Sequence, residues 1–182
     1  QNALDIDYRI TTTAPTTLQV TNGICFNLSG DMHRSILKQH LWLDTHYTNK
    51  LDKEQFPTNE LQKTRLTPFD FTQPREIGER IKATVNGYYH AFQLRHPDNM
   101  QKPAAILFDA QSGRAMTIYS SEPTLLINTH GAQSSGITLQ PLHAGYNSGM
   151  EKVDNSLQPG QVFHGATVFL FTTDPPLIMK TK

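Results

Sequence analysis

The amino-acid sequence predicts an all-β protein, a sandwich of antiparallel sheets with few short helices. Short stretches of alternating apolar and polar residues recur along the chain, as strands with one buried face require. Eleven prolines and eleven glycines separate these stretches, which is typical of sandwiches with long connections. With 182 residues, the chain has the length for one hydrophobic core, so we expect residues 1–182 to form a single domain.

The strands are predicted in order from this alternation. Residues 4–10 (LDIDYRI) place apolar side chains on one face, and residues 18–21 resume an extended run after a Thr-rich turn. That run meets Asn22-Gly23, a dipeptide that favours a left-handed backbone. Further strands are expected at 39–44, 89–95, 104–109, 114–119, 123–128 and 161–171. The last is the richest in β-branched and aromatic residues.

Two connecting segments have recognisable turn chemistry. Residues 109–114 (DAQSGR) predict a hairpin turn, with Gly113 as the residue that tolerates a left-handed backbone. Residues 74–83 (PREIGERIKA) begin with proline, carry acids early and a lysine late. They predict a short helix or turn over the sheet.

The composition excludes several classes of function. Sixteen basic residues balance sixteen acidic ones, and the isoelectric point is about 7.3, so we expect neither nucleic acid nor a membrane surface as partner. Neutral ligands such as sugars remain. No apolar run is long enough for a membrane span, and the first residues show no signal peptide, although Gln1 is compatible with a residue exposed by cleavage. The localisation therefore stays open.

Cofactor and metal motifs are absent from the sequence. Eight histidines are present, but His40 and His46 are six residues apart, and no H-x-H or H-E-x-x-H pair occurs. There is no phosphate loop, dinucleotide fingerprint or G-x-S-x-G motif. The single cysteine, Cys25, excludes an intrachain disulfide and is interpreted as a small buried apolar group. We therefore expect no cofactor and no metal.

The aromatic residues after Gly87 suggest a sugar cleft. Tyr88, Tyr89 and His90 begin a predicted strand, so neighbouring side chains alternate between its faces and at least one ring can stand in a cleft. Sugars stack their apolar faces on such rings. The alternative is that these rings only pack the core.

Six segments in order extend the interpretation to nearly the whole chain. They are TNGICFNLSG (21–30), HLWLDTHYT (40–48), LTPFDFTQPREIGERI (66–81), GYYHAFQL (87–94), DAQSGRAMTIYSSEPTLLI (109–127) and LQPGQVFHGATVFLF (157–171). This series resembles the aldose 1-epimerase, or galactose mutarotase, family from its middle to its carboxyl end. The resemblance implies a galactose mutarotase-like β-sandwich, here a partial supersandwich, whose concave face binds a hexose.

The resemblance also implies a mechanism. In the family a glutamate takes the proton from the anomeric hydroxyl of the sugar, and a histidine protonates the ring oxygen. The ring opens and can then close on either face. An aspartate holds the sugar hydroxyls. Such paired general acid–base chemistry needs two titratable groups on opposite sides of the sugar.

The family's functional positions fall on other residue types in this chain. The acid histidine corresponds to Gly23, the sugar-binding aspartate to Tyr89 and the glutamate base to Gln140. Glycine has no side-chain proton, and a glutamine amide is not a base at neutral pH. The sugar-binding residues implied by the resemblance are Asn22, Tyr89, His90 and Gln140, and no residue is assigned a catalytic role.

A second alignment of residues 136–151 is open. It matches HAGY (143–146) to a related string and places Gly149 at the base position, with Glu151 two residues beyond. Neither alignment puts a carboxylate in register. If proton transfer has moved to other groups, the nearest candidates are His90, His143 and Glu151.

Three functions follow as hypotheses. The first is a degenerate aldose 1-epimerase-like carbohydrate-binding module without mutarotase activity. The second is an active aldose 1-epimerase that interconverts hexose anomers such as those of galactose or glucose. The third is a structural or interaction subunit whose cleft is filled by Tyr89. The resemblance begins in the middle of the family, so the family's amino-terminal strands have no counterpart in this sequence. We therefore expect a second chain that supplies them, or a homo-oligomer.

Overall fold

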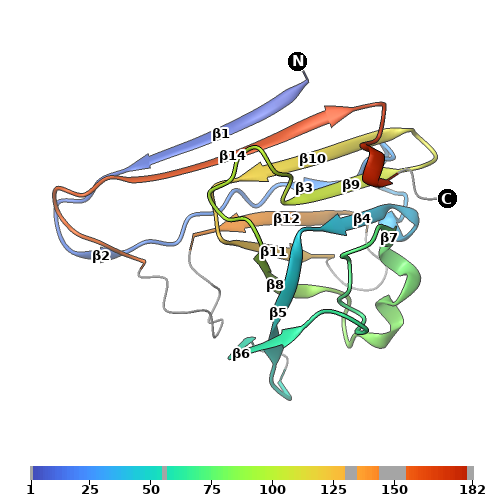
Figure 1. Cartoon of the computed structure of the whole chain (residues 1–182), viewed down its shortest axis with the longest axis horizontal. Coiled ribbons are helices and arrows are strands. Elements are labelled where there is room, and N and C mark those ends of the chain that lie inside the picture. The colour runs from blue at the N-terminus through green and yellow to red at the C-terminus, as the bar shows by residue number, and fades with distance from the viewer. Residues whose placement is uncertain (1, 55–56, 130–134, 144–154, 180–182) are drawn as a thin grey trace.

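The computed structural model describes residues 2–54, 57–129, 135–143 and 155–179. In this part of the chain, two six-stranded sheets and one two-stranded sheet form, and all of their strand pairs are antiparallel. Figure 1 shows the long strands of the first sheet in the upper part of the view, with the strands of the second sheet below them. The all-β prediction is confirmed. No helix in the described ranges has the length and apolar character to cross a membrane.

The chain passes back and forth between the two large sheets. The first sheet has the order β1 (Ala3–Ile10), β14 (Phe163–Thr172), β10 (Arg114–Ser120), β9 (Ala105–Asp109), β4 (His40–Leu43) and β7 (Arg75–Glu76). The second has the order β3 (Cys25–Phe26), β12 (Ile137–Leu142), β11 (Thr124–Asn128), β8 (Tyr89–Leu94), β5 (Thr45–Leu51) and β6 (Pro57–Lys63). The small sheet pairs β13 (Ser156–Leu157) with β2 (Thr16–Thr17). The helices are short 3₁₀ segments, η1 (Ile36–Lys38), η2 (Ile77–Glu79), η3 (Ile81–Ala83) and η4 (Leu177–Met179).

The main core lies between the two large sheets. Strand alternation sends Leu107 and Phe169 inward from the first sheet and Phe92 and Leu125 inward from the second, and all four are fully buried. Burying a side chain of this size stabilises the fold by about 1.5–3 kcal/mol. The other face of the second sheet points away from this core.

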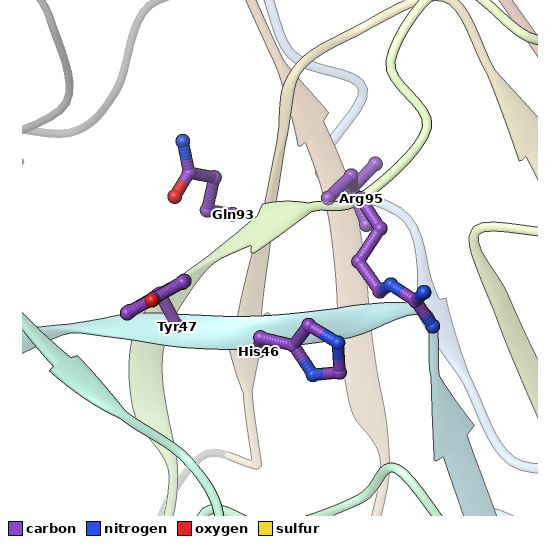
Figure 2. Close-up of a pocket in the computed structure, with 5 residues that line it drawn as sticks. His46, Tyr47, Gln93 and Arg95 are labelled. Atoms are coloured by element: carbon purple, nitrogen blue, oxygen red, sulfur yellow. The ribbon is translucent and has the colours of Figure 1, made fainter.

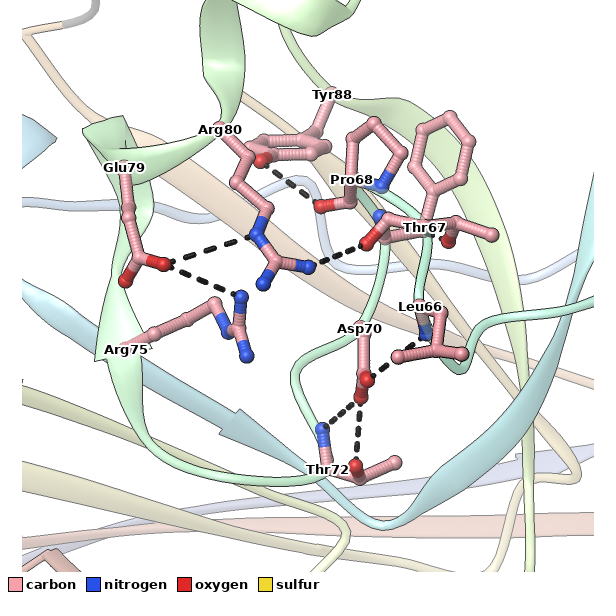
Figure 3. Close-up of polar contacts among 10 residues, drawn as sticks. Leu66, Thr67, Pro68, Asp70, Thr72, Arg75, Glu79, Arg80 and Tyr88 are labelled. Atoms are coloured by element: carbon pink, nitrogen blue, oxygen red, sulfur yellow. Dashed lines mark hydrogen bonds and ion pairs between the residues drawn. The ribbon is translucent and has the colours of Figure 1, made fainter.

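A tight loop fixes the aromatic corner of this core. Figure 3 shows the Asp70 carboxylate accepting hydrogen bonds from the Thr72 N–H and hydroxyl and from the Leu66 N–H. Leu66 has a positive φ of 64°, a strained conformation that the Asp70 contact helps to hold. Partial burial raises the pKa of Asp70, but these hydrogen bonds and the nearby Arg75 outweigh burial, so the pKa is lowered overall.

The same loop anchors Tyr88. Its hydroxyl donates to the Pro68 carbonyl at 3.2 Å, and its ring meets Phe71 edge-on at 5.1 Å between centroids. Burial raises the pKa of Tyr88 to about 12, so the phenol stays protonated. Tyr88 is 1% exposed, and it therefore fixes the start of β8, which carries Tyr89 and His90.

Several sequence predictions need correction. Residues 18–21 form no strand, because pairing occurs at Thr16–Thr17 instead. Residues 74–83 contain a two-residue strand and two separate 3₁₀ turns, so the turn prediction holds but no continuous helix forms. Cys25 is exposed, contrary to the expectation of burial, because it lies in an edge strand on the face away from the core. Strands β5, β6 and β12 were not predicted.

Candidate functional site

The second sheet has an outer face that points away from the main core. Since side chains alternate along a strand, this face carries one residue in two from three adjacent strands: Tyr89, Ala91 and Gln93 of β8; Thr124, Leu126 and Asn128 of β11; Thr138, Gln140 and Leu142 of β12. The pairing register aligns Leu126 with both Ala91 and Gln140. Ala91, Leu126 and Leu142 form a small buried apolar cluster, bordered by the polar side chains of Gln93, Asn128 and Gln140. Because the three apolar residues are at most 7% exposed, contacts to a ligand on this face fall to the polar side chains that border them.

Gly23 and Gln140 lie together at one side of the outer face. Gly23 has a φ of 63°, in the left-handed region that its sequence predicted, and it precedes β3, the neighbour of β12. A Cβ built on Gly23 would lie 3.5 Å from the Gln140 Nε2. The structure thus brings together the two positions that the family resemblance assigns to acid and base. Asn22 shapes this turn, because its Oδ1 accepts from the Ile24 N–H at 3.2 Å.

Tyr89 is on the same face as Gln140. It pairs with Asn128 across β8 and β11, and Asn128 in turn pairs with Thr138 of β12, so the three side chains form a row across the sheet. Tyr89 is 37% exposed. Its ring is therefore accessible for stacking, and its hydroxyl offers both a donor and an acceptor.

His90 points to the opposite side of the sheet from Tyr89. It is 4% exposed, and its ring lies 4.2 Å from the Phe69 ring between centroids. Its Nδ1 accepts from the Tyr89 N–H at 3.2 Å, so the ring proton sits on Nε2. Burial lowers the pKa of His90 to about 4. The register of β8 is regular at Tyr89 and His90, so their side chains point to opposite faces and His90 does not join Tyr89 and Gln140.

His143 forms a pair with a buried carboxylate. Its Nδ1 lies 3.2 Å from the Glu122 Oε2, and its ring meets Phe163 edge-on at 4.6 Å. Burial raises the pKa of Glu122, and the facing imidazole partly offsets this increase. His143 follows Leu142 at the end of β12, beyond the row of Thr124 and Leu142. Glu151 and Gly149, the residues of the second alignment, lie outside the described residues.

A cavity of about 290 Å³ adjoins the outer face on β5 and the end of β8. It is lined by His46, Tyr47, Gln93, Leu94 and Arg95, and Figure 2 shows the Arg95 side chain extending toward the His46 ring. Sequence reasoning missed this site, because strand β5 has no alternating apolar residues. The sequence feature that could have indicated this cavity is the pair His46-Tyr47, two aromatic residues in an otherwise polar segment. No group of three or more metal-ligating side chains occurs within the described ranges.

The fold and this face define a galactose mutarotase-like β-sandwich. The structure is similar to a GalM/aldose epimerase homologue from C. elegans, with a TM-score of 0.82 and 19% identity over 94% of this chain and 56% of that one. It is also similar to a galactose 1-epimerase from Lactobacillus acidophilus NCFM, with a TM-score of 0.79, 19% identity and coverage of 94% and 53%. The aldose 1-epimerase family model matches residues 1–169. The chain belongs to the aldose 1-epimerase family, as its sequence motifs predicted.

Curated relatives agree with this assignment. The chain is 24% identical over 185 residues to the galactose mutarotase of Sus scrofa, which covers 93% of this chain and 54% of that protein. It is 29% identical over 130 residues to the aldose 1-epimerase of Escherichia coli K12, which covers 68% of this chain and 37% of that protein. The chain thus spans about half the length of the mammalian relative.

Proposed function

We propose that this chain is a carbohydrate-binding member of the aldose 1-epimerase family that lacks the proton-transfer pair. The observation that carries the proposal is the contact between the Gly23 and Gln140 positions, 3.5 Å from a built Cβ to Nε2. The resemblance assigns the acid and the base to these two positions. In this chain the acid position is Gly23, which has no side chain, and the base position is Gln140, whose amide is neutral.

The binding part of the proposal depends on the outer face. Gln140, Tyr89 and Gln93 carry donors and acceptors suited to sugar hydroxyls, and the Tyr89 ring, in a residue that is 37% exposed, offers an apolar surface for the C–H face of a pyranose. Ligand sites commonly combine such an apolar surface with a few polar groups. The relatives' names point to galactose as the first sugar to test.

The missing activity follows from the chemistry of the two positions. A general acid or base each contributes about 10²–10⁴-fold to a proton-transfer reaction. Gly23 can donate no side-chain proton, and the Gln140 amide does not titrate near neutral pH. His90 faces the opposite side of the sheet, so it cannot replace them on this face.

Sugar titration tests the proposal. We expect millimolar galactose or glucose to raise the melting temperature of the chain and to shift backbone amide resonances around Gln140 and Leu126. Gln140→Leu should weaken binding several-fold, because it removes the hydrogen bonds of the amide. Gln158→Leu is the matched control, since Gln158 is exposed on the turn before β14. If no sugar shifts the melting temperature, the proposal fails and the chain is better explained as a structural subunit.

A second part of the proposal concerns assembly. We propose that a second chain, or a second copy of this one, covers the edge of the first sheet. β1 pairs with β14 on one side only in the described part of the chain, and its core-facing Leu4 is 40% exposed. Unprotected edges of this kind favour association. Light scattering of the chain at micromolar concentration should report a dimer or larger species, and a monodisperse monomer would contradict this proposal.

A further inference from the structure

Strand β5 contains a bulge where it meets β8. Thr45 pairs with Leu94 and Tyr47 pairs with Gln93, so His46 is an extra residue in the register. A bulge of this type sets two side chains against one on the partner strand. His46 and Tyr47 are consequently both exposed, whereas regular alternation would bury one of them.

Buried contacts hold the bulge in place. The Thr45 hydroxyl lies 2.6 Å from the Gln93 carbonyl oxygen and 2.9 Å from the Tyr47 carbonyl oxygen, and Thr45 is fully buried. The His46 carbonyl accepts from the Thr64 N–H at 2.9 Å. The backbone under His46 and Tyr47 is therefore fixed, and the two rings project from a rigid support.

Positive charge gathers around this bulge in a chain of zero net charge. Arg95 lines the same cavity as His46 and Tyr47. Lys63 of β6 pairs with Tyr47 of β5, so the exposed Lys63 side chain lies on the same face of the sheet as the Tyr47 ring. Arg95 contacts the acidic side chain of Asp44, whose Oδ1 lies 3.6 Å from the Arg95 Nη1.

Asp44 acts as a support for Arg95. Its side chain is 9% exposed, and its other oxygen pairs with His96, so the carboxylate is enclosed behind the guanidinium. Arg95 itself is 47% exposed at its side chain. A carboxylate that holds an arginine from behind leaves the outer edge of the guanidinium to meet a ligand, and a guanidinium pairs well with carboxylate or sulfate oxygens.

The separation between the cavity and Gln140 sets the size of the ligand. Gln140 is on β12 and Tyr47 is on β5, three inter-strand steps apart in the order β12, β11, β8, β5. With strands about 4.8 Å apart, the span is about 14 Å. One pyranose ring is too small to cover it, whereas an oligosaccharide can.

We propose that the outer face binds an acidic oligosaccharide, with an anionic sugar residue in the cavity of Tyr47, Gln93 and Arg95 and the neutral part of the ligand on the face near Gln140. This inference rests on the proposed sugar-binding function. The anion is a carboxylate or a sulfate. Tyr47 stacks on the ring of that residue, and Arg95 pairs with its charged group.

Isothermal titration at low salt tests this inference with defined probes. The probes are a galacturonate trimer, a sulfated galactan trisaccharide, a neutral trisaccharide and galactose. At least one acidic trimer should bind tenfold or more tightly than the neutral one, and its identity distinguishes carboxylate from sulfate. The preference should disappear in Arg95→Gln and weaken in high salt. Arg9→Gln, which removes an exposed arginine from the first sheet, is the matched control and should keep the preference.

The outcomes separate the two proposals. If galactose binds but the acidic and neutral trisaccharides bind equally, the acidic-ligand inference is wrong and the sugar-binding function stands. A preference that survives Arg95→Gln also overturns the inference. If neither galactose nor any trisaccharide binds, both proposals fail.

Discussion

A Cβ atom on Gly23 would lie 3.5 Å from the Nε2 of Gln140, which is ordinary van der Waals contact. The two positions therefore adjoin each other directly on this face of the sheet. The left-handed φ of Gly23, 63°, disfavours most residues, but histidine is among the non-glycine residues enriched there. The contact between Gly23 and Gln140 thus suggests a direct way to rebuild an acid and a base.

We predict that the double variant Gly23→His/Gln140→Glu accelerates mutarotation of α-galactose at least tenfold over the unmodified chain. Each single variant should give less, because ring opening needs both groups. Polarimetry measures the rate. Gly160→His is a control for backbone strain, since Gly160 also has a positive φ and nothing within 4 Å of its built Cβ. A double variant that binds sugar without any acceleration would count against the assigned roles.

His90 should make the chain sensitive to mild acid. Its pKa in the folded state is about 4, against about 6.5 in an unfolded chain. Between these values the unfolded state binds a proton that the folded state does not, so stability is present above pH 6.5 and falls as the pH drops toward 4. The loss attributable to His90 is about 3 kcal/mol by pH 4.

We therefore expect His90→Phe to flatten the decline in unfolding free energy between pH 6.5 and pH 4, measured by urea denaturation. His33→Phe, at an exposed loop position, should leave the decline unchanged. An identical pH profile for His90→Phe and the unmodified chain would show that His90 is protonated normally in the fold.

Tyr88→Phe should destabilise the fold by about 1 kcal/mol. The variant keeps the packing against Phe71 but removes the hydrogen bond to the Pro68 carbonyl, and one such bond contributes about 0.5–1.5 kcal/mol. Urea denaturation gives the change. Tyr47→Phe, at a 37% exposed ring, should have no comparable effect, and equal losses in both variants would contradict the role of this hydrogen bond.

Gly165→Ala should destabilise the fold by about 1–3 kcal/mol through overpacking. A Cβ at Gly165 would overlap the Glu122 carboxylate and lie 3.1 Å from the Phe163 ring. If that overlap is the cause, Glu122→Ala should recover part of the loss in the double variant. A double-mutant cycle measures this coupling, and purely additive losses would show that the two residues do not compete for space.

The sequence predicted the fold where the apolar pattern was strong. β1, β4, β8, β9, β10, β11 and β14 lie within or close to their predicted ranges. β1 alternates apolar with polar residues, whereas β9 and β11 are short, nearly continuous apolar runs. β12 was missed since Pro141 lies in it. That proline is tolerated because β3 pairs only with Ile137 and Thr138, which leaves the far end of β12 without a partner strand on that side in the described residues.

The site could be predicted in part. Motif matching selected Gly23 and Gln140, and strand alternation alone implied that Tyr89 and His90 point to opposite faces. The bulge at His46 is a property of register between β5 and β8, which depends on tertiary pairing that a single sequence does not encode locally. The Glu122–His143 pair likewise joins loops at the ends of different strands.

Polarimetry of the unmodified chain distinguishes a sugar-binding protein without the proton-transfer pair from an active epimerase. Fresh α-galactose is followed with and without the chain, under conditions where binding of the same sugar has been detected by the shift in melting temperature. We expect the sugar to bind and mutarotation to proceed at the solvent rate. An acceleration well above the solvent rate, above all one that disappears in His143→Gln, would contradict this expectation and show an active epimerase with relocated groups.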